Sequence, residues 1–281
     1  MENALELQVI ADSLHNRLHN HAVHVPKLPE LAAKALQISR TPGSEPGLLA
    51  ELLESQQTLK EKLLTVYRHG FAAPADAQLD SMLLHLGQQT VADFTLALCL
   101  NTGLFYAPGY GQSIAEQLRQ AVLCGLWSRE VALLRRRHME AAFICGLCKS
   151  IGRPVVIESA LDCAVRHRMH LSYDDLMVLA DQFEYGATQR VLETWQMPEV
   201  VHAVAAHWLD YRVAGEAQGQ TMITVAGARL TTLFGRHSKH LVDKETLHKE
   251  RVFSDLGLNS LQIEQLGHSA GRIAMIADSF I

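Results

Sequence analysis

The chain has 281 residues, 48% of them hydrophobic and 20% charged, a globular composition that excludes a chain disordered throughout. Its formal net charge of -5 argues against a general nucleic-acid-binding protein, because contacts to the phosphate backbone need clustered lysines and arginines. No stretch has the roughly eighteen uninterrupted apolar residues of a membrane span, residues 1–6 lack the pattern of a signal peptide, and the five cysteines are odd in number. We therefore expect reduced thiols and a cytoplasmic protein that does not bind membranes.

Apolar residues recur at three- to five-residue spacing along the first 108 residues, which is typical of amphipathic helices. Thr58, with Glu61 three residues later, predicts a capping box at the start of the helix near residues 59–67. The turn Ala107-Pro108-Gly109 is the clearest break in this half, and we place a boundary there between an N-terminal subdomain, 1–108, and a second subdomain, 109–281. The predicted helices lie near residues 4–18, 29–41, 46–53, 59–67, 79–86 and 90–105.

The second half shows the same helical spacing. The only candidate strand, 153–157, is too short and isolated for a sheet, so the sequence predicts an all-α fold. Arg135-Arg136-Arg137 is the one basic run, and we interpret it as a helix end, where cations suit the helix dipole. The predicted helices lie near residues 112–134, 138–149, 154–168, 172–181, 184–194, 198–208 and 220–235, with a last pair within 244–281.

Short segments at four places in the chain follow one another in a familiar order. Residues 25–31 begin with paired prolines, residues 79–87 form a short helix that ends in Leu-Gly, residues 140–152 read up to Lys-Ser-Ile-Gly, and residues 185–208 carry a glycine, Trp-x-x-Pro and His-Trp. In this order they resemble the HDOD signalling domains, relatives of the HD and HD-GYP phosphohydrolases, over about residues 24–275. The resemblance implies a multi-helix HDOD fold, in which an N-terminal helical subdomain packs on an HD-like helical subdomain with C-terminal helices.

The same resemblance implies that the metal site of the HD enzymes is degenerate. In those enzymes a His-Asp pair holds divalent metal, which generates a hydroxide nucleophile near neutral pH. Lys149 and Ser150 stand where that pair would be, and further ligand positions fall at Gln182 and Ala228. His207 is the one ligand that remains. One ligand does not assemble a metal site, so we expect no catalytic residue, no metal and no cofactor.

Two other features have ordinary structural explanations. Cys145 and Cys148 have CxxC spacing, but a structural zinc needs four ligands and the chain has no second CxxC, so we expect buried, inert thiols. We expect His207 to be bonded to a nearby backbone carbonyl. Trp195, with Met197-Pro198, is expected to fix the junction between two helices rather than to bind a ligand.

The resemblance implies a non-catalytic bacterial signal-transduction module that acts as a protein-interaction or regulatory scaffold. The expected partners are signalling proteins: a sensor kinase, a response regulator or a cyclic-dinucleotide enzyme. Two alternatives stay open. One is a small-molecule or nucleotide sensor that uses the cavity left by the vacant HD site, and the other is a residual metal-dependent phosphodiesterase, which would need metal ligands that the sequence does not reveal. The oligomeric state stays open as well.

Overall fold

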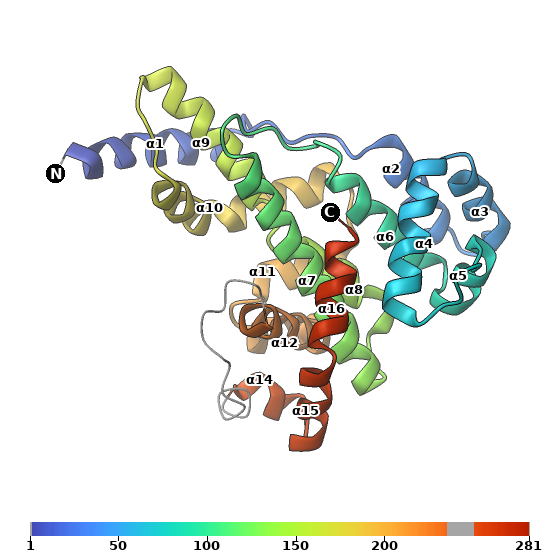
Figure 1. Ribbon diagram of the computed structural model, residues 1–281. Helices are drawn as coiled ribbons and strands as arrows, with labels where there is room; N and C mark the ends of the chain where they lie inside the picture. Colours follow the sequence, from blue (N-terminus) through green and yellow to red (C-terminus); the bar gives the residue numbers. More distant parts are fainter. Residues whose placement is uncertain (1, 235–249, 281) are drawn as a thin grey trace.

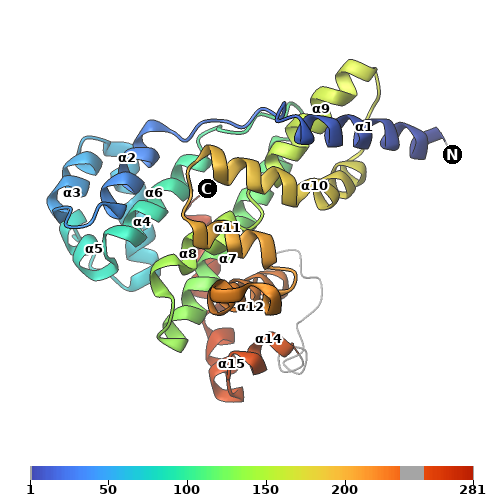
Figure 2. The same cartoon turned by 180° about the vertical axis from the view of Figure 1, so that it is seen from behind.

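The computed structural model describes residues 2–234 and 250–280, and all regular elements in these ranges are helices (Figures 1 and 2). The predicted all-α fold is therefore confirmed. The helices of the first half are α1 Glu2–His19, α2 Glu30–Arg40, α3 Pro46–Glu54, α4 Gln57–Phe71, α5 Leu79–Leu86 and α6 Gln88–Leu100. Those of the second half are α7 Gly111–Arg135, α8 Met139–Cys148, α9 Arg153–His167, α10 Tyr173–Thr194, α11 Glu199–His207, the short 3-10 helices η1 Tyr211–Val213 and η2 Gly215–Ala217, α12 Gln218–Phe234, α14 Arg251–Asp255, α15 Ser260–His268 and α16 Ala270–Asp278.

Local sequence signals explain several helix ends. Ser172 caps α10: its hydroxyl accepts from the backbone N–H of Asp175 at 3.2 Å, and the Asp175 carboxylate accepts from the Ser172 N–H at 2.9 Å. This is a capping box, which satisfies two otherwise unpaired donors of the first turn. The basic run ends α7 as predicted, with Arg135 in its last turn and Arg136 in the left-handed conformation as its C-cap.

Several local predictions are wrong. The helix α4 begins at Gln57 and has no side-chain cap, so Thr58 lies inside the helix rather than at its N-cap. The two helices expected at 172–181 and 184–194 are one, α10, because its buried residues keep helical spacing through the expected gap. By contrast, the helix predicted near 154–168 is confirmed as α9. It includes the segment 153–157, which the sequence excludes as a strand, and Pro154 suits its first turn.

The end of α6 and the number of helices at the C-terminal end of the chain also differ from the predictions. The helix expected to reach residue 105 ends at Leu100, and a turn follows it. A pair of helices was expected within 244–281, of which the structure describes residues 250–280. This described part holds three helices, α14, α15 and α16. Residue 235 and residues 244–249 lie outside the described residues.

The central element is α7, the longest helix of the described ranges, which packs against α8, α9, α12 and α16 (Figure 1). Small residues allow α7, α8 and α12 to approach closely. A Cβ atom at Gly146 would lie 2.6 Å from the carbonyl oxygen of Cys124, and one at Gly227 would lie 2.3 Å from the hydroxyl of Ser128. These approaches are shorter than side chains tolerate, so the two glycines are required where α8 and α12 meet α7.

The helices α2 to α6 form one group, whereas α1 lies apart from them and packs against α9 and α10 (Figures 1 and 2). The last helix, α16, contacts both α7 and α4. Contacts therefore cross the expected subdomain boundary at residue 108 in both directions, and the division into 1–108 and 109–281 stays a prediction. Within the two described ranges, no helix combines the length and apolar character needed to cross a membrane.

Candidate functional site

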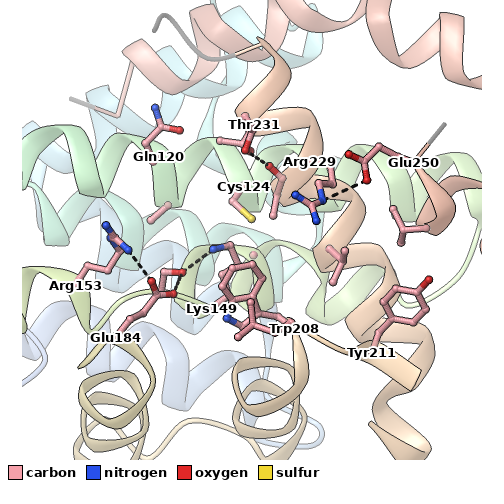
Figure 3. A pocket seen from close by; sticks show the side chains of 18 of the residues that line it. Gln120, Cys124, Lys149, Arg153, Glu184, Trp208, Tyr211, Arg229, Thr231 and Glu250 are labelled. Atoms are coloured by element: carbon pink, nitrogen blue, oxygen red, sulfur yellow. Dashed lines mark hydrogen bonds and ion pairs between the residues drawn. The ribbon is translucent and has the colours of Figure 1, made fainter. Parts of the chain in front are cut away.

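A cavity of about 430 Å³ opens beside the turn between α8 and α9 (Figure 3). Its walls come from α7, α10, α12 and the start of α14, together with residues that follow α11. The side chains that carry its chemistry are Lys149, Ser150, Arg153, Glu184, Trp208 and Arg229.

A glycine brings the α8–α9 turn onto α10. A Cβ atom at Gly152 would lie 2.2 Å from the backbone nitrogen of Thr188, a distance that no side chain tolerates. The Gly152 N–H donates to the Thr188 hydroxyl at 3.1 Å, and both residues are buried. This close approach places Ser150 within reach of Glu184, one turn earlier on α10.

A continuous polar chain crosses one side of the cavity (Figure 3). The Lys149 ammonium donates to the Ser150 hydroxyl at 2.6 Å, and that hydroxyl donates to one oxygen of Glu184. The other Glu184 oxygen accepts from the Arg153 guanidinium at 2.8 Å, and Arg153 also binds Asp181 at 2.6 Å. The Glu184 carboxylate is therefore shared by an arginine and a hydroxyl.

The Lys149 ammonium also lies over the ring of Trp208, 4.1 Å from its centroid (Figure 3). A cation over the face of an indole is attracted by the ring quadrupole. No ion pair joins Lys149 to a carboxylate in the part of the chain that the structure describes. Its charge is balanced through Ser150 and the ring rather than by direct contact with an anion.

The opposite wall carries two more arginines. The Arg229 Nε lies 3.4 Å from an oxygen of Glu250 (Figure 3), and the Arg251 Nε lies 3.4 Å from an oxygen of Asp255. Tyr211 donates to the same Asp255 carboxylate at 2.5 Å. The cavity lining thus holds four cationic side chains and two carboxylates, in a chain whose total charge is negative.

Of the five positions that the sequence singled out, Lys149, Ser150 and Ala228 line this cavity. Gln182 is exposed and does not line it, and neither does His207. Neighbouring residues take their places at the wall: Glu184, two positions after Gln182, and Trp208, directly after His207. The sequence reasoning missed Glu184. Its three-residue spacing from an aspartate on α10 was a signal of a shared helix face.

The other expected contacts have mixed outcomes. In the described ranges no hydrogen bond joins the His207 ring to a backbone carbonyl, so that expectation was wrong. Trp195 lies at the α10–α11 turn as predicted, and its indole N–H donates to the Pro26 carbonyl at 2.8 Å. Cys145 and Cys148 are buried free thiols, as predicted, and burial raises the pKa of both.

Residues that could hold a metal are few at this cavity. In residues 2–234 and 250–280, no three His, Cys, Asp or Glu side chains lie close enough together to hold a metal ion. The carboxylates at the cavity are those of Glu184 and Glu250, and each pairs with an arginine.

The chain matches one family model and is similar in fold to several solved structures. A family model described as the HDOD domain matches residues 25–209. A candidate metal-dependent phosphohydrolase from Shewanella amazonensis SB2B is similar over 100% of both chains, with a TM-score of 0.73 and 18% identity. An HDOD domain protein of unknown function from Geobacter sulfurreducens is similar over 98% of both chains, with a TM-score of 0.69 and 12% identity.

A third solved structure is a candidate signal transduction protein from Marinobacter aquaeolei VT8. It is similar over 98% of this chain and 66% of its own, with a TM-score of 0.64 and 15% identity. No curated protein matches the chain. At these identities the structural likeness establishes the shared fold alone.

Proposed function

This chain belongs to the HDOD domain family, and from that premise we propose that it is a non-catalytic signal-transduction module that acts as a protein-interaction or regulatory scaffold. The matched residues run from before α2 to just past α11, and so include the α8–α9 turn and the cavity wall on α10. The name of the similar Marinobacter protein supports a role in signalling. Five buried free thiols support a cytoplasmic location.

The observation that carries the proposal is the Lys149 ammonium inside the cavity. An ammonium has three donors and no lone pair, so it is not a metal ligand, and its charge repels a divalent cation. It donates to Ser150 at 2.6 Å, and a neutral hydroxyl is a poor substitute for a bridging carboxylate. The two positions that correspond to the His-Asp pair therefore disfavour metal.

The carboxylates at the cavity do not replace the missing metal ligands. Glu184 already binds Arg153 and Ser150, and Glu250 lies against Arg229. A hydrolytic centre of the HD type needs several imidazole and carboxylate ligands around the metal. The donor set of this cavity does not fit such a centre, and we derive no hydrolytic step from it.

Metal content and turnover test the loss of catalysis. We expect protein purified after growth with manganese and iron to contain far less than one metal per chain. It should not hydrolyse bis(p-nitrophenyl) phosphate with added manganese, whereas an active HD phosphohydrolase assayed in parallel does. Stoichiometric iron, manganese or zinc together with turnover would contradict the proposal and favour the residual phosphodiesterase.

Partner capture tests the scaffold role. The protein, tagged and expressed at its native level in its own host, should enrich a sensor kinase, a response regulator or a cyclic-dinucleotide enzyme in mass spectrometry. A preparation without any such partner contradicts the scaffold role.

A second candidate function is a small-molecule sensor at the same cavity. The excess of cationic over acidic side chains in its lining favours an anionic ligand such as a nucleotide. A thermal-shift screen with nucleotides and cyclic dinucleotides tests it, because a ligand that binds the native state raises the midpoint of unfolding. The shift should be lost in Lys149→Gln and kept in Lys34→Gln, whose lysine lies on the surface of α2.

A further inference from the structure

A second cavity, of about 700 Å³, lies away from the Lys149 cavity, between α2, α5 and α6 on one side and α7, α8 and α11 on the other. Its volume is within the range of about 300–1,000 Å³ that is common for small-molecule sites. Much of its wall is apolar. The apolar side chains that line it include Leu86, Leu133, Ile144, Pro198, Val200 and Val201.

Two arginines, Arg40 and Arg129, line this apolar cavity. The Arg40 guanidinium donates to the sulfur of Met197 at 3.3 Å, and its Nε is buried without a partner. The Arg129 guanidinium lies over the Phe71 ring, 4.9 Å from the centroid. Within the described ranges, neither arginine has an ion pair with a carboxylate, and Arg129 has no hydrogen bond from its side chain.

Both side chains are half-buried, and a half-buried cation without an anion is costly, because the Met197 sulfur and the Phe71 ring replace only part of the lost hydration. Burial accordingly lowers the pKa of the Arg40 and Arg129 guanidinium groups, although the charges of Asp93 on Arg40 and of Glu130 on Arg129 act in the opposite direction. Glu130 itself pairs with Arg272. The carboxyl whose charge acts on Arg40 is that of the fully buried Asp93, whose pKa burial raises to about 8, so it is mostly protonated at neutral pH. Glu140 also lines the cavity, but its side chain is exposed and pairs with neither arginine.

A third group points to a ligand. Gln88 lines the same cavity, and its side-chain oxygen is buried without a hydrogen-bond donor, although its side-chain nitrogen donates to the Ser44 carbonyl at 3.3 Å. Buried polar atoms are nearly always paired in folded proteins. The unpaired Nε donor of Arg40 and the unpaired acceptor of Gln88 belong to side chains that line one cavity, and together they fit a ligand that has a charged acceptor group and a donor such as a hydroxyl.

We propose that this cavity binds a small amphiphilic anion, whose carboxylate or phosphate group is held by Arg40 and Arg129 and whose apolar part packs against α8 and α11. Guanidinium groups bind both kinds of headgroup through paired N–H donors. Because the walls come from α2, α5 and α6 and from α7, α8 and α11, a bound ligand would contact both groups of helices at once. The site is distinct from the Lys149 cavity, with which it shares no lining residue.

Fluorescence titration tests the proposal. The probe is 8-anilinonaphthalene-1-sulfonate, an aromatic anion whose emission rises in an apolar site. We expect saturable binding to the folded protein, and displacement by octanoate, by octyl phosphate or by both, but not by the uncharged 1-octanol. The more effective competitor identifies the headgroup. Displacement by 1-octanol at the same concentrations, or no saturable binding of the probe, would overturn the proposal.

Substitutions locate the site. Arg40→Met and Arg129→Met should each weaken probe binding by about tenfold or more, the loss expected for a charge-assisted contact. Arg129→Lys should keep part of the affinity, because it keeps the charge. Arg166→Met is the matched control, since Arg166 is exposed on α9 and outside the cavity, and it should bind as the wild type does. Equal affinity in Arg40→Met and wild type would overturn the proposal even if an Arg129 variant fails to fold.

Discussion

The carboxyl of Asp93 is fully buried in α6. One oxygen accepts from the side-chain amide of Gln89 at 2.8 Å, and the other has no partner. Burial raises the pKa of this carboxyl from 3.8 to about 8, and the Gln89 bond and the charge of Arg40 oppose the rise only in part. The folded protein therefore keeps a proton near neutral pH that the unfolded chain releases.

Because of this retained proton, the free energy of unfolding depends on pH. Because the folded pKa lies above the unfolded value, stability is lost as pH rises from about 4 to about 8 and stays constant above that. Each pH unit in this window costs about 1.4 kcal/mol, so at pH 7, roughly three units above 3.8, the cost is about 4 kcal/mol. Asp93→Asn removes the titration and keeps the oxygen that binds Gln89. We expect this variant to gain about that much stability at pH 7 and little near pH 4.

Urea denaturation followed by far-UV circular dichroism, repeated between pH 4 and pH 8, measures the difference. The control is Asp80→Asn, because Asp80 is exposed on α5 and its substitution should leave the pH profile of the wild type unchanged. If the free energies of unfolding of Asp93→Asn and wild type run parallel across the window, Asp93 does not hold a proton in the folded state, and the reasoning is refuted.

Three further predictions concern the Lys149 cavity, the helix packing and the thiols. The double variant Lys149→His with Ser150→Asp should show no phosphodiesterase turnover with manganese, because the other ligand positions stay empty; turnover would revive the enzymatic alternative. Gly227→Ala should lower the free energy of unfolding by about 2 kcal/mol or more, since its Cβ would lie 2.3 Å from a serine hydroxyl of α7. The added Cβ of Gly271→Ala would meet nothing within 4 Å, so this variant should instead stabilise α16 by up to about 1 kcal/mol; urea denaturation measures both variants. The five buried thiols, of which Cys148 has a strongly raised pKa, should resist Ellman's reagent in the native protein and all react in urea; fast native reaction would contradict their burial.

Local patterns in the sequence determined the fold class. Helical periodicity is a property of neighbouring residues, so the spacing of apolar side chains predicted an all-α chain, and most helices lie where it placed them. Helix ends were harder, because several signals compete at each one. Ser172 and Asp175 form a capping box at α10, whereas the similar Thr58 and Glu61 lie inside α4 and make none.

Tertiary structure decided which polar groups meet. The family resemblance predicted a degenerate metal site at Lys149 and Ser150, but only the close approach at Gly152 brings that turn to Glu184, more than thirty residues away. The same limit applies to the second cavity, whose two arginines come from α2 and α7. A sequence shows how many charges a chain carries, but whether a charge is hydrated, paired or buried alone depends on distances between distant segments, and these exist only after the helices have packed.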